Sequence, residues 1–94
     1  MTKSDLIEAI AAQSSETWTK KDVEGAVNTI FKSMTDALMN GDRIEIRGLG
    51  SFRVKERMPR IGRNPKTGEQ VSIPARRVPH FTVGKHLKAR VEEA

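Results

Sequence analysis

The chain contains no cysteine among its 94 residues, which excludes disulfide bridges and metal sites built from thiolates. It also contains no run of about 18 apolar residues, the length that a membrane-spanning helix requires. The opening residues, Met1 to Asp5, are polar and include an acid, unlike the start of a signal peptide. These absences predict a cytoplasmic protein that does not associate with membranes.

Signatures of catalysis and metal binding are equally scarce. His80 and His86 are the only histidines, and neither has a ligand partner at a recognisable spacing, so we interpret both as surface or packing residues. Lys66 and Thr67 precede a glycine, the reverse of the order in a phosphate-binding P-loop. No serine lies in a nucleophile turn. We therefore predict no catalytic residue, no metal site, no cofactor and no enzymatic activity.

Positive charge is concentrated in the second half of the chain. Residues 1–40 carry four Lys or Arg and six Asp or Glu, a net charge of −2, whereas residues 41–94 carry thirteen and six, a net charge of +7. Within 53–77, eight cations accompany only two anions. Such a concentration is typical of a protein that binds a polyanion, although on charge alone a solvated basic surface explains it equally well.

A first helix is predicted over 3–13. Thr2 and Asp5 have the spacing of a capping box, in which each side chain accepts a hydrogen bond from the other residue's backbone N–H. A polar turn over 14–16 should end this helix. The apolar residues at helical spacing are Leu6, Ile7, Ile10 and Ala11.

A second, longer helix is predicted over 20–40. The segment 18–23 repeats the capping signal and adds a hydrophobic staple between its first and last residues, and Gly41 suits the C-terminal cap. The other predicted elements are too few to cover this helix, so we expect a dimer that shares its apolar stripe. The stripe consists of Val23, Ala26, Val27, Ile30, Phe31, Met34, Ala37 and Leu38.

The period of apolar residues then changes from 3.6 to 2. Residues 43–47 alternate polar and apolar side chains, as a half-buried strand does, and 52–55 repeat the pattern after a Gly-Leu-Gly turn. A third strand is predicted over 78–81. Thr82 is predicted to cap a last helix over 83–93, with its apolar residues Leu87 and Val91 facing inward.

The segment 56–77 is too polar to join a core. We interpret it as a long hairpin, the arm, which projects into solvent and turns at 64–68. Pro65 at this turn is rigid, apolar and without an N–H, so it suits insertion into a DNA base step while neighbouring cations follow the phosphates. The flanking arginines favour this interpretation over an ordinary polar turn. The predicted fold class is α+β, a single domain over 1–94 with a helix–helix body, a three-stranded antiparallel sheet extended into a β-arm, and a short C-terminal helix.

Three motifs resemble the HU and integration host factor family of bacterial nucleoid DNA-bending proteins. They are residues 48–52, the arm tip at 62–68, and Val78-Pro79-His80-Phe81 with the Gly84, Leu87 and Lys88 that follow. The resemblance covers essentially the whole chain. HU and integration host factor are standard examples of minor-groove binding, so the resemblance implies that class of DNA binding.

The resemblance implies an intertwined dimer whose two arms surround double-stranded DNA, with the proline of each tip partly inserted between base pairs. Residues near the tip would touch the groove or backbone, residues along the strands would line the arm, and lysines of the body would meet phosphates. The complete set of predicted DNA-binding residues is Lys3, Arg43, Glu45, Arg47, Arg53, Lys55, Arg57, Arg60, Arg63, Asn64, Pro65, Lys66, Arg76, Arg77, Lys85 and Lys88.

Subfamily signals point in two directions. Residues 43–47 and the opening Met-Thr-Lys-Ser resemble the beta subunit of integration host factor, whereas 75–78 and 87–92 resemble the alpha subunit. Val83 replaces a proline common before the family's last helix. A homodimer and a heterodimer with a related subunit are therefore both open.

The predicted function is that of an architectural protein that bends and compacts chromosomal DNA in the bacterial nucleoid. One alternative is a site-preferring subunit like those of integration host factor. Another is a module that binds RNA or an anionic surface without bending DNA. Cations on an arm around a proline turn, instead of on an amphipathic helix, favour nucleic acid over a membrane.

Overall fold

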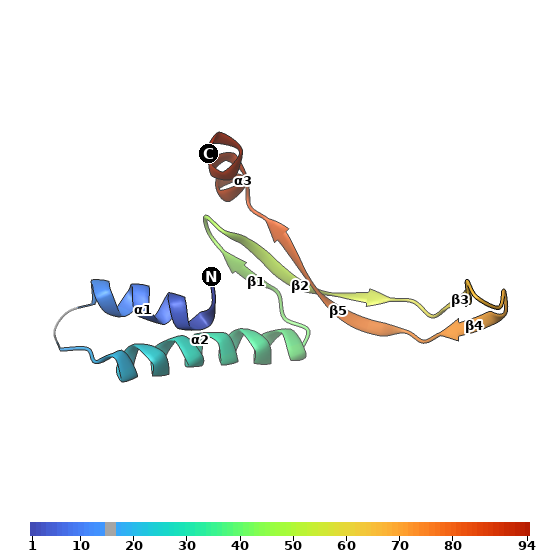
Figure 1. The fold of residues 1–94 in the computed structure, drawn as a ribbon, viewed down its shortest axis with the longest axis horizontal. Coiled ribbons are helices and arrows are strands. Elements are labelled where there is room, and N and C mark those ends of the chain that lie inside the picture. The colour runs from blue at the N-terminus through green and yellow to red at the C-terminus, as the bar shows by residue number, and fades with distance from the viewer. Residues whose placement is uncertain (15–16) are drawn as a thin grey trace. The chain divides into compact units, whose positions relative to one another are not determined.

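The computed structural model describes residues 1–14 and 17–94 (Figure 1), so residues 15 and 16 of the expected polar turn lie outside the described residues. The expected α+β class is confirmed. The chain divides into two compact units, Met1–Asp36 and Ala37–Ala94, which we call the helical unit and the sheet unit. In chain order the elements are α1 (Lys3–Gln13), α2 (Lys20–Met39), β1 (Ile44–Ile46), β2 (Gly50–Arg57), β3 (Arg60–Arg63), β4 (Gln70–Ile73), β5 (Arg76–Val83) and α3 (Lys85–Glu93).

Both expected caps are present at the starts of α1 and α2. Asp5 N–H donates to Thr2 Oγ1 at 3.2 Å, and Thr2 N–H donates to Asp5 Oδ2 at 2.9 Å. Thr19 and Asp22 make the same reciprocal pair at 3.1 and 3.0 Å. Since each box pairs two N–H groups near a helix start, both helices begin where the sequence predicts.

The core of the helical unit is small. Four large apolar side chains of this unit remain between 40% and 57% exposed: Ile10, Trp18, Ile30 and Phe31. The stripe along α2 is therefore only half covered by α1. The side chains that are buried there are Ile7, Val23 and Val27.

The C-terminal end of α2 is closed by backbone hydrogen bonds. Gly41 has a φ of 80°, and its N–H donates to the Leu38 carbonyl at 3.0 Å. Asp42 N–H donates to the Ala37 carbonyl at 2.9 Å. This is the Schellman pattern, so the expected role of Gly41 is confirmed, and α2 ends at Met39, one residue earlier than predicted.

The sheet unit holds a three-stranded antiparallel sheet in the order β1-β2-β5. Ile44 pairs with Phe52, and Phe52 pairs in turn with Phe81, whose ring centroid lies 4.8 Å from that of Phe52. Strand β5 is longer than predicted because its pairing with β2 continues from Arg76 to Val83.

This longer strand corrects the predicted start of the last helix. Thr82 is part of β5 and does not cap α3, which begins at Lys85 with Gly84 as its N-cap. Gly84 N–H donates to the Leu49 carbonyl at 2.9 Å, so the chain stays extended up to this residue. Leu87 is half-buried as expected, but Val91 is 65% exposed.

Strand β2 requires glycine at its first position, directly after the turn from β1. Gly50 has a φ of 155°, a conformation that residues with a side chain rarely adopt. A Cβ there would also collide with the Thr82 carbonyl oxygen and the Phe81 ring. The close approach of β2 and β5 at this end of the sheet therefore depends on Gly50.

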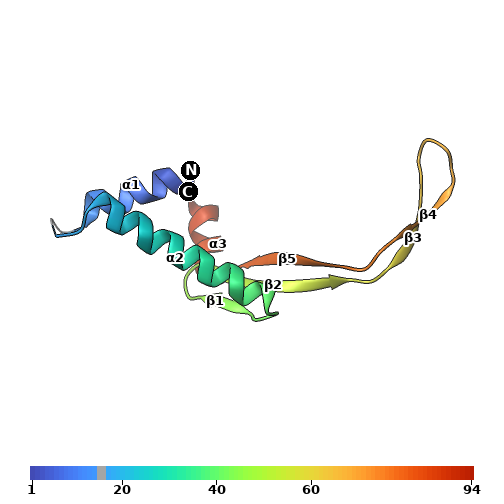
Figure 2. The same ribbon diagram turned by 90° about the horizontal axis from the view of Figure 1, so that it is seen from below.

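The arm continues the β2–β5 hairpin with an interruption. Pairing of β2 with β5 ends at Arg57 and Arg76, and the pairing of β3 with β4 resumes at Arg60 and Ile73. Two residues on each strand lie between, so the register is unchanged. Both gaps contain a proline, which has no N–H to donate to a ladder. The hairpin turns away at this point, as Figure 2 shows, and we call the four intervening residues, 58–59 and 74–75, the elbow.

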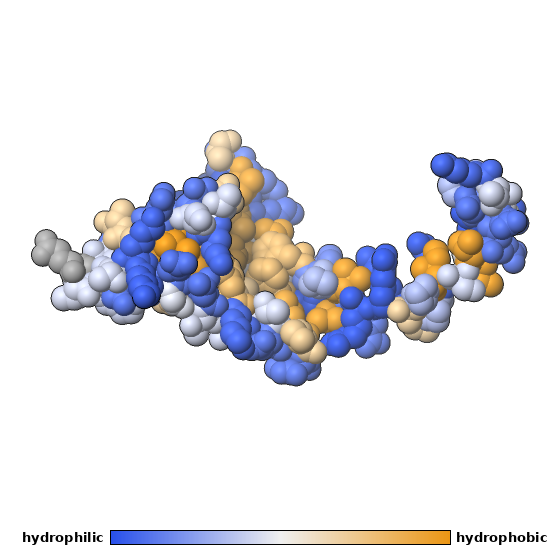
Figure 3. Space-filling view, turned by 60° about the horizontal axis from the view of Figure 1, so that its bottom comes forward, coloured by the Kyte–Doolittle hydropathy of each residue, from blue (hydrophilic) through white to orange (hydrophobic). Residues whose placement is uncertain are grey.

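Apolar side chains of the sheet unit are poorly covered. No side chain between Ala37 and Ala94, all of which are described, is fully buried. Figure 3 shows orange side chains open to the surface along the sheet and the arm. A unit of this size without buried side chains cannot offset the entropy of ordering its backbone. The expected dimer, with a core shared by Ile30, Phe31 and Phe52, would supply the missing burial.

We predict that the purified chain is a dimer whose folding and assembly are coupled. Light scattering at micromolar concentration should give about twice the 10.5 kDa mass of one chain. The thermal midpoint should rise with protein concentration, because dissociation accompanies unfolding. A folded monomer with a midpoint independent of concentration would contradict this prediction.

Candidate nucleic-acid interface

Strand alternation sorts the sheet unit into two chemically different faces. Paired residues of antiparallel strands project to the same face, and successive residues to opposite faces. One face, which we call the basic face, carries Glu45, Ser51, Arg53, Lys55, Arg57, Arg76, Val78, His80 and Thr82. The opposite, apolar face carries Ile44, Ile46, Phe52, Val54, Pro79, Phe81 and Val83, together with Glu56 and Arg77.

Acidic partners are few on the basic face. Arg43 precedes β1, and its guanidinium lies 3.0 Å from Glu45 Oε1. Among the ion pairs found within 1–14 and 17–94, this is the only one that involves the basic face. The positive charges of Arg53, Lys55 and Arg57 are therefore left to attract an external anion.

His80 belongs to this face although the sequence did not indicate it. It pairs across the strands with Arg53 and is half-buried. Partial burial, together with the positive charges of Lys55, Arg53 and Arg57, lowers the pKa of its imidazole below the usual value. The lowered pKa favours a neutral imidazole at pH 7, and the expected role of His80 as a surface or packing residue stays a prediction.

Arg77 was expected beside Arg76 as a DNA contact, but it projects from the apolar face. Its Nη1 donates to the carbonyl oxygen of Met39 at 3.5 Å, at the C-terminal end of α2. Cations are favourable at this end of a helix because unpaired carbonyls carry partial negative charge. This position favours a structural role for Arg77, in which it holds the root of the arm against the end of α2.

The arm tip is a tight turn that its own side chains stabilise. Asn64 Oδ1 accepts from Lys66 N–H at 2.9 Å, and the Asn64 carbonyl accepts from Gly68 N–H at 2.7 Å. Gly68 has a φ of 73°, which glycine allows. The expected turn is confirmed, and Asn64 is engaged in forming it. Pro65 follows and is exposed, with Lys66 beside it.

Cations flank the tip on both sides of the ribbon. Arg60 pairs with Ile73, and Arg63 pairs with Gln70, so alternation places the two arginines on opposite faces of the β3–β4 hairpin. Apolar residues are exposed near them, with Ile61 at 72% and Met58 at 80%. A narrow ribbon with cations and apolar side chains suits the minor groove, whose walls are phosphates and whose floor is formed by base edges.

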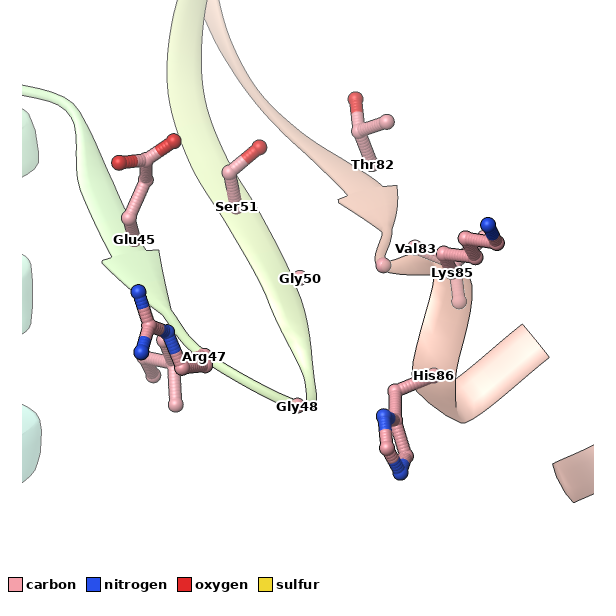
Figure 4. Close-up of a pocket in the computed structure, with 11 residues that line it drawn as sticks. Glu45, Arg47, Gly48, Gly50, Ser51, Thr82, Val83, Lys85 and His86 are labelled. Carbon is pink, nitrogen blue, oxygen red and sulfur yellow. The ribbon is translucent and has the colours of Figure 1, made fainter. Parts of the chain in front are cut away.

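A second anion-attracting feature lies where β5 meets α3 (Figure 4). A hollow of about 540 Å³ opens between the β1–β2 turn and the first residues of α3. Arg47 and Lys85 line it with His86 and Glu45, and the start of α3 has no side-chain cap. Uncapped N–H groups carry partial positive charge, so this end of the sheet unit also favours anions.

Two of the predicted lysines have intramolecular partners. Lys3 lies in the helical unit, where its Nζ donates to Asn28 Oδ1 at 2.9 Å. Lys88 lies on α3, 3.9 Å from a carboxylate oxygen of Glu92. Neither pair is buried, so both lysines stay accessible to solvent.

The alternation within β5 was the available signal for the residues that the sequence analysis missed. Arg76, Val78, His80 and Thr82 follow one another at a period of two, but the strand was predicted to start only at Val78. With the correct bounds, His80 and Thr82 fall on the face that carries Arg76.

Two other kinds of site were searched for in the part of the chain that the structure describes. No three His, Asp or Glu side chains gather there as a metal ion would need. Neither 1–14 nor 17–94 contains a helix with the length and apolar character for crossing a membrane. The basic face, the arm and the hollow beside α3 are the features described above whose chemistry favours an anionic ligand.

The chain is similar to known proteins in sequence and in fold. The family pattern described as bacterial DNA-binding protein matches residues 1–92. Integration host factor subunit beta of Dechloromonas aromatica is 53% identical to this chain, and the match covers 100% of this chain and 99% of that protein. The subunit of the same name from Aeromonas hydrophila is 55% identical, with the same coverage. A cocrystal structure of Anabaena HU with DNA is 37% identical, covers 100% of both chains and has a TM-score of 0.84. The structure of HU from Thermotoga maritima is 32% identical, covers 97% of this chain and 98% of that one, and has a TM-score of 0.65.

Arg76 and Arg77 offer a matched pair for testing the two faces. We predict that Arg77→Ala lowers the free energy of unfolding by about 0.3–1 kcal/mol, because the α2 terminus loses a cation, whereas Arg76→Ala leaves it nearly unchanged. Thermal denaturation of both variants at equal protein concentration checks this. Equal losses in the two variants would contradict the structural role of Arg77.

Proposed function

We propose a function from one premise: the chain belongs to the bacterial DNA-binding protein family. The protein is an architectural DNA-binding protein that bends duplex DNA with its β-arm in the minor groove. Residues 1–94 act as one functional domain of the bacterial nucleoid in the cytoplasm, without catalysing a reaction. The observation that carries this proposal is the separation of charge between the two faces of the hairpin.

The basic face supplies the electrostatic attraction. Its cations lie in a row along β2 and β5, and the β3–β4 hairpin adds Arg60 and Arg63 on its two faces. A row of cations spaced along a ribbon matches the regular spacing of phosphates along a duplex, and neutralising them releases condensed counterions. The proposed backbone contacts are Arg53, Lys55, Arg57, Arg60, Arg63, Lys66 and Arg76, with Arg43, Arg47, Lys85 and Lys88 near the sheet end.

Pro65 supplies the deformation. It is exposed at the end of the arm, and the hydrogen bonds of Asn64 and Gly68 hold the turn behind it. A rigid apolar ring held in this way can enter a base step and unstack it, at a cost of a few kcal/mol that contacts along the bent duplex offset. A polar turn without a wedge would bind the backbone but would not favour a kink.

A second chain completes the binding surface. The apolar face of the sheet and the exposed stripe of α2 call for a partner of similar shape, and an intertwined dimer would present two arms to one duplex. Two relatives are named integration host factor subunit beta, which supports a subunit that pairs with a related chain. The chain alone would form a homodimer.

A mobility-shift experiment with the purified chain tests the proposal. We expect binding to linear duplex DNA, with tighter binding to nicked and pre-bent duplexes, in which part of the deformation is already made. Double-stranded RNA of the same length is the matched control, because its A-form minor groove is wide and shallow. Equal affinity for RNA and DNA would instead support the module that binds polyanions without bending them.

The salt dependence of binding separates contact residues from structural ones. We predict that Arg76→Ala reduces the slope of log affinity against log salt by about 1, because one phosphate contact is lost, while Arg77→Ala leaves the slope unchanged. Binding curves at four salt concentrations on one nicked duplex give both slopes. A reduced slope for Arg77→Ala alone would place the DNA on the apolar side of the arm.

Pro65→Ala should reduce bending more than affinity. The substitution removes most of the apolar ring but keeps every cation, so straight DNA should bend less while affinity for nicked DNA changes little. Energy transfer between dyes at the duplex ends measures the bend, with binding curves recorded in parallel. If Pro65→Ala bends straight DNA fully, Pro65 serves only to form the turn and does not act as a wedge. An equal loss of affinity on all duplexes would indicate that the substitution damages the turn.

A further inference from the structure

We propose that His80 couples DNA binding to proton uptake: it is a neutral imidazole in the free protein and becomes an imidazolium when phosphates cover the basic face. This inference rests on the proposed function and adds to it a dependence of affinity on pH. His80 is a titratable group among residues whose positive charge is fixed. The inference gives a reason for its place on the basic face.

The surroundings of His80 in the free protein disfavour a proton. Arg53, Lys55 and Arg57 on β2 share its face, with Arg53 directly opposite, and Arg76 lies on the same face of β5. The carboxylate of this face belongs to Glu45 on β1, and it is paired with Arg43 at 3.0 Å. No acid is therefore free to stabilise an imidazolium, and partial burial adds to the cost. The lowered pKa of His80 agrees with this arrangement.

A bound duplex reverses the sign of the local field. Phosphates that pair with Arg53, Lys55 and Arg57 bring negative charge to the same side of the sheet as the imidazole. An opposite charge within a few ångströms favours the protonated form, so the pKa of His80 is higher in the complex than in the free protein. The imidazolium then adds one cation to the interface.

The sign of the pH dependence follows from linkage. The complex holds more protons than its separated parts at pH values between the two pKa values of His80, so affinity rises as pH falls through that window. Its lower bound lies below the ordinary histidine value of 6.5, because the free pKa is lowered. Above the window His80 is neutral in both states, and below it the residue is charged in both.

His80→Gln provides the test, and His80→Lys, which places a fixed cation at the same position, is its counterpart. Glutamine is neutral and polar, so it substitutes for the neutral imidazole. Lysine carries its charge throughout this pH range, so it substitutes for the imidazolium. Both variants are compared with the unsubstituted protein on a nicked duplex from pH 8 to pH 5.5 at constant ionic strength.

We expect the unsubstituted protein to bind more tightly as pH falls, by about tenfold per chain for each unit by which the pKa of His80 rises on binding. His80→Gln should bind as tightly at pH 8 but show a smaller increase as pH falls, and His80→Lys should bind more tightly at pH 8 with a similarly small increase. An increase in His80→Gln as large as that of the unsubstituted protein would overturn the inference.

Direct titration of the unsubstituted protein avoids any effect of substitution on folding. NMR of the imidazole carbons and nitrogens gives the pKa of His80 in the free protein and in the complex. A higher value in the complex supports the inference, and equal values overturn it even if the variants behave as expected. Loss of DNA binding at every pH would contradict the proposed function itself, an outcome that both measurements distinguish from a failure of the proton coupling.

Discussion

The register of one long hairpin governs the chemistry of the sheet unit. Because β2 and β5 pair without a shift from Gly50–Val83 to Arg57–Arg76, cations at every second position stay on one face and aromatic rings stay on the other. A shift of a single residue would exchange the two sets and would place Phe52 and Phe81 among arginines. Gly50 protects this register at one end, since a side chain there would push β2 away from β5.

The same register explains how the arm can turn without losing order. The elbow removes two rungs of the ladder, where its prolines have no N–H to donate, but it adds no extra residue to either strand. The β3–β4 hairpin therefore continues in phase beyond the elbow. This arrangement lets the tip change direction relative to the sheet while Arg60, Arg63 and the turn residues keep fixed positions relative to one another.

Features that depend on neighbouring residues were predictable from the sequence, and features that depend on distant pairing were not. The caps at Thr2 and Thr19, the Gly41 terminus and the turn at 64–68 are each formed within a few residues, and all four are confirmed. Thr82 carried a local capping signal, but its pairing with Ser51 keeps it in the strand. Long-range backbone pairing outweighs a single cap because it fixes several residues together.

The candidate site shows the same limit. A run of positive charge identified the arm, but charge alone does not reveal which way a side chain projects. Arg76 and Arg77 are chemically identical neighbours, yet one joins the basic face and the other reaches the end of α2. His80 was not identified as part of the site, because the cations Arg53, Lys55 and Arg57 on its face belong to β2 and lie far from it in the sequence.

The lack of a buried core in the sheet unit follows from the same division of faces. A two-faced ribbon that gives one face to an external polyanion has only the other face for burial, and one chain has too little apolar surface to cover it. The apolar face must therefore be completed by a second chain before the basic face is held in place. Stability and DNA binding are thus linked through the ribbon: substitutions on the apolar face, such as at Phe81, would weaken binding by disordering the opposite face without touching DNA. The fold accommodates a surface of like charges because the energy that opposes their repulsion comes from the other side of the same strands.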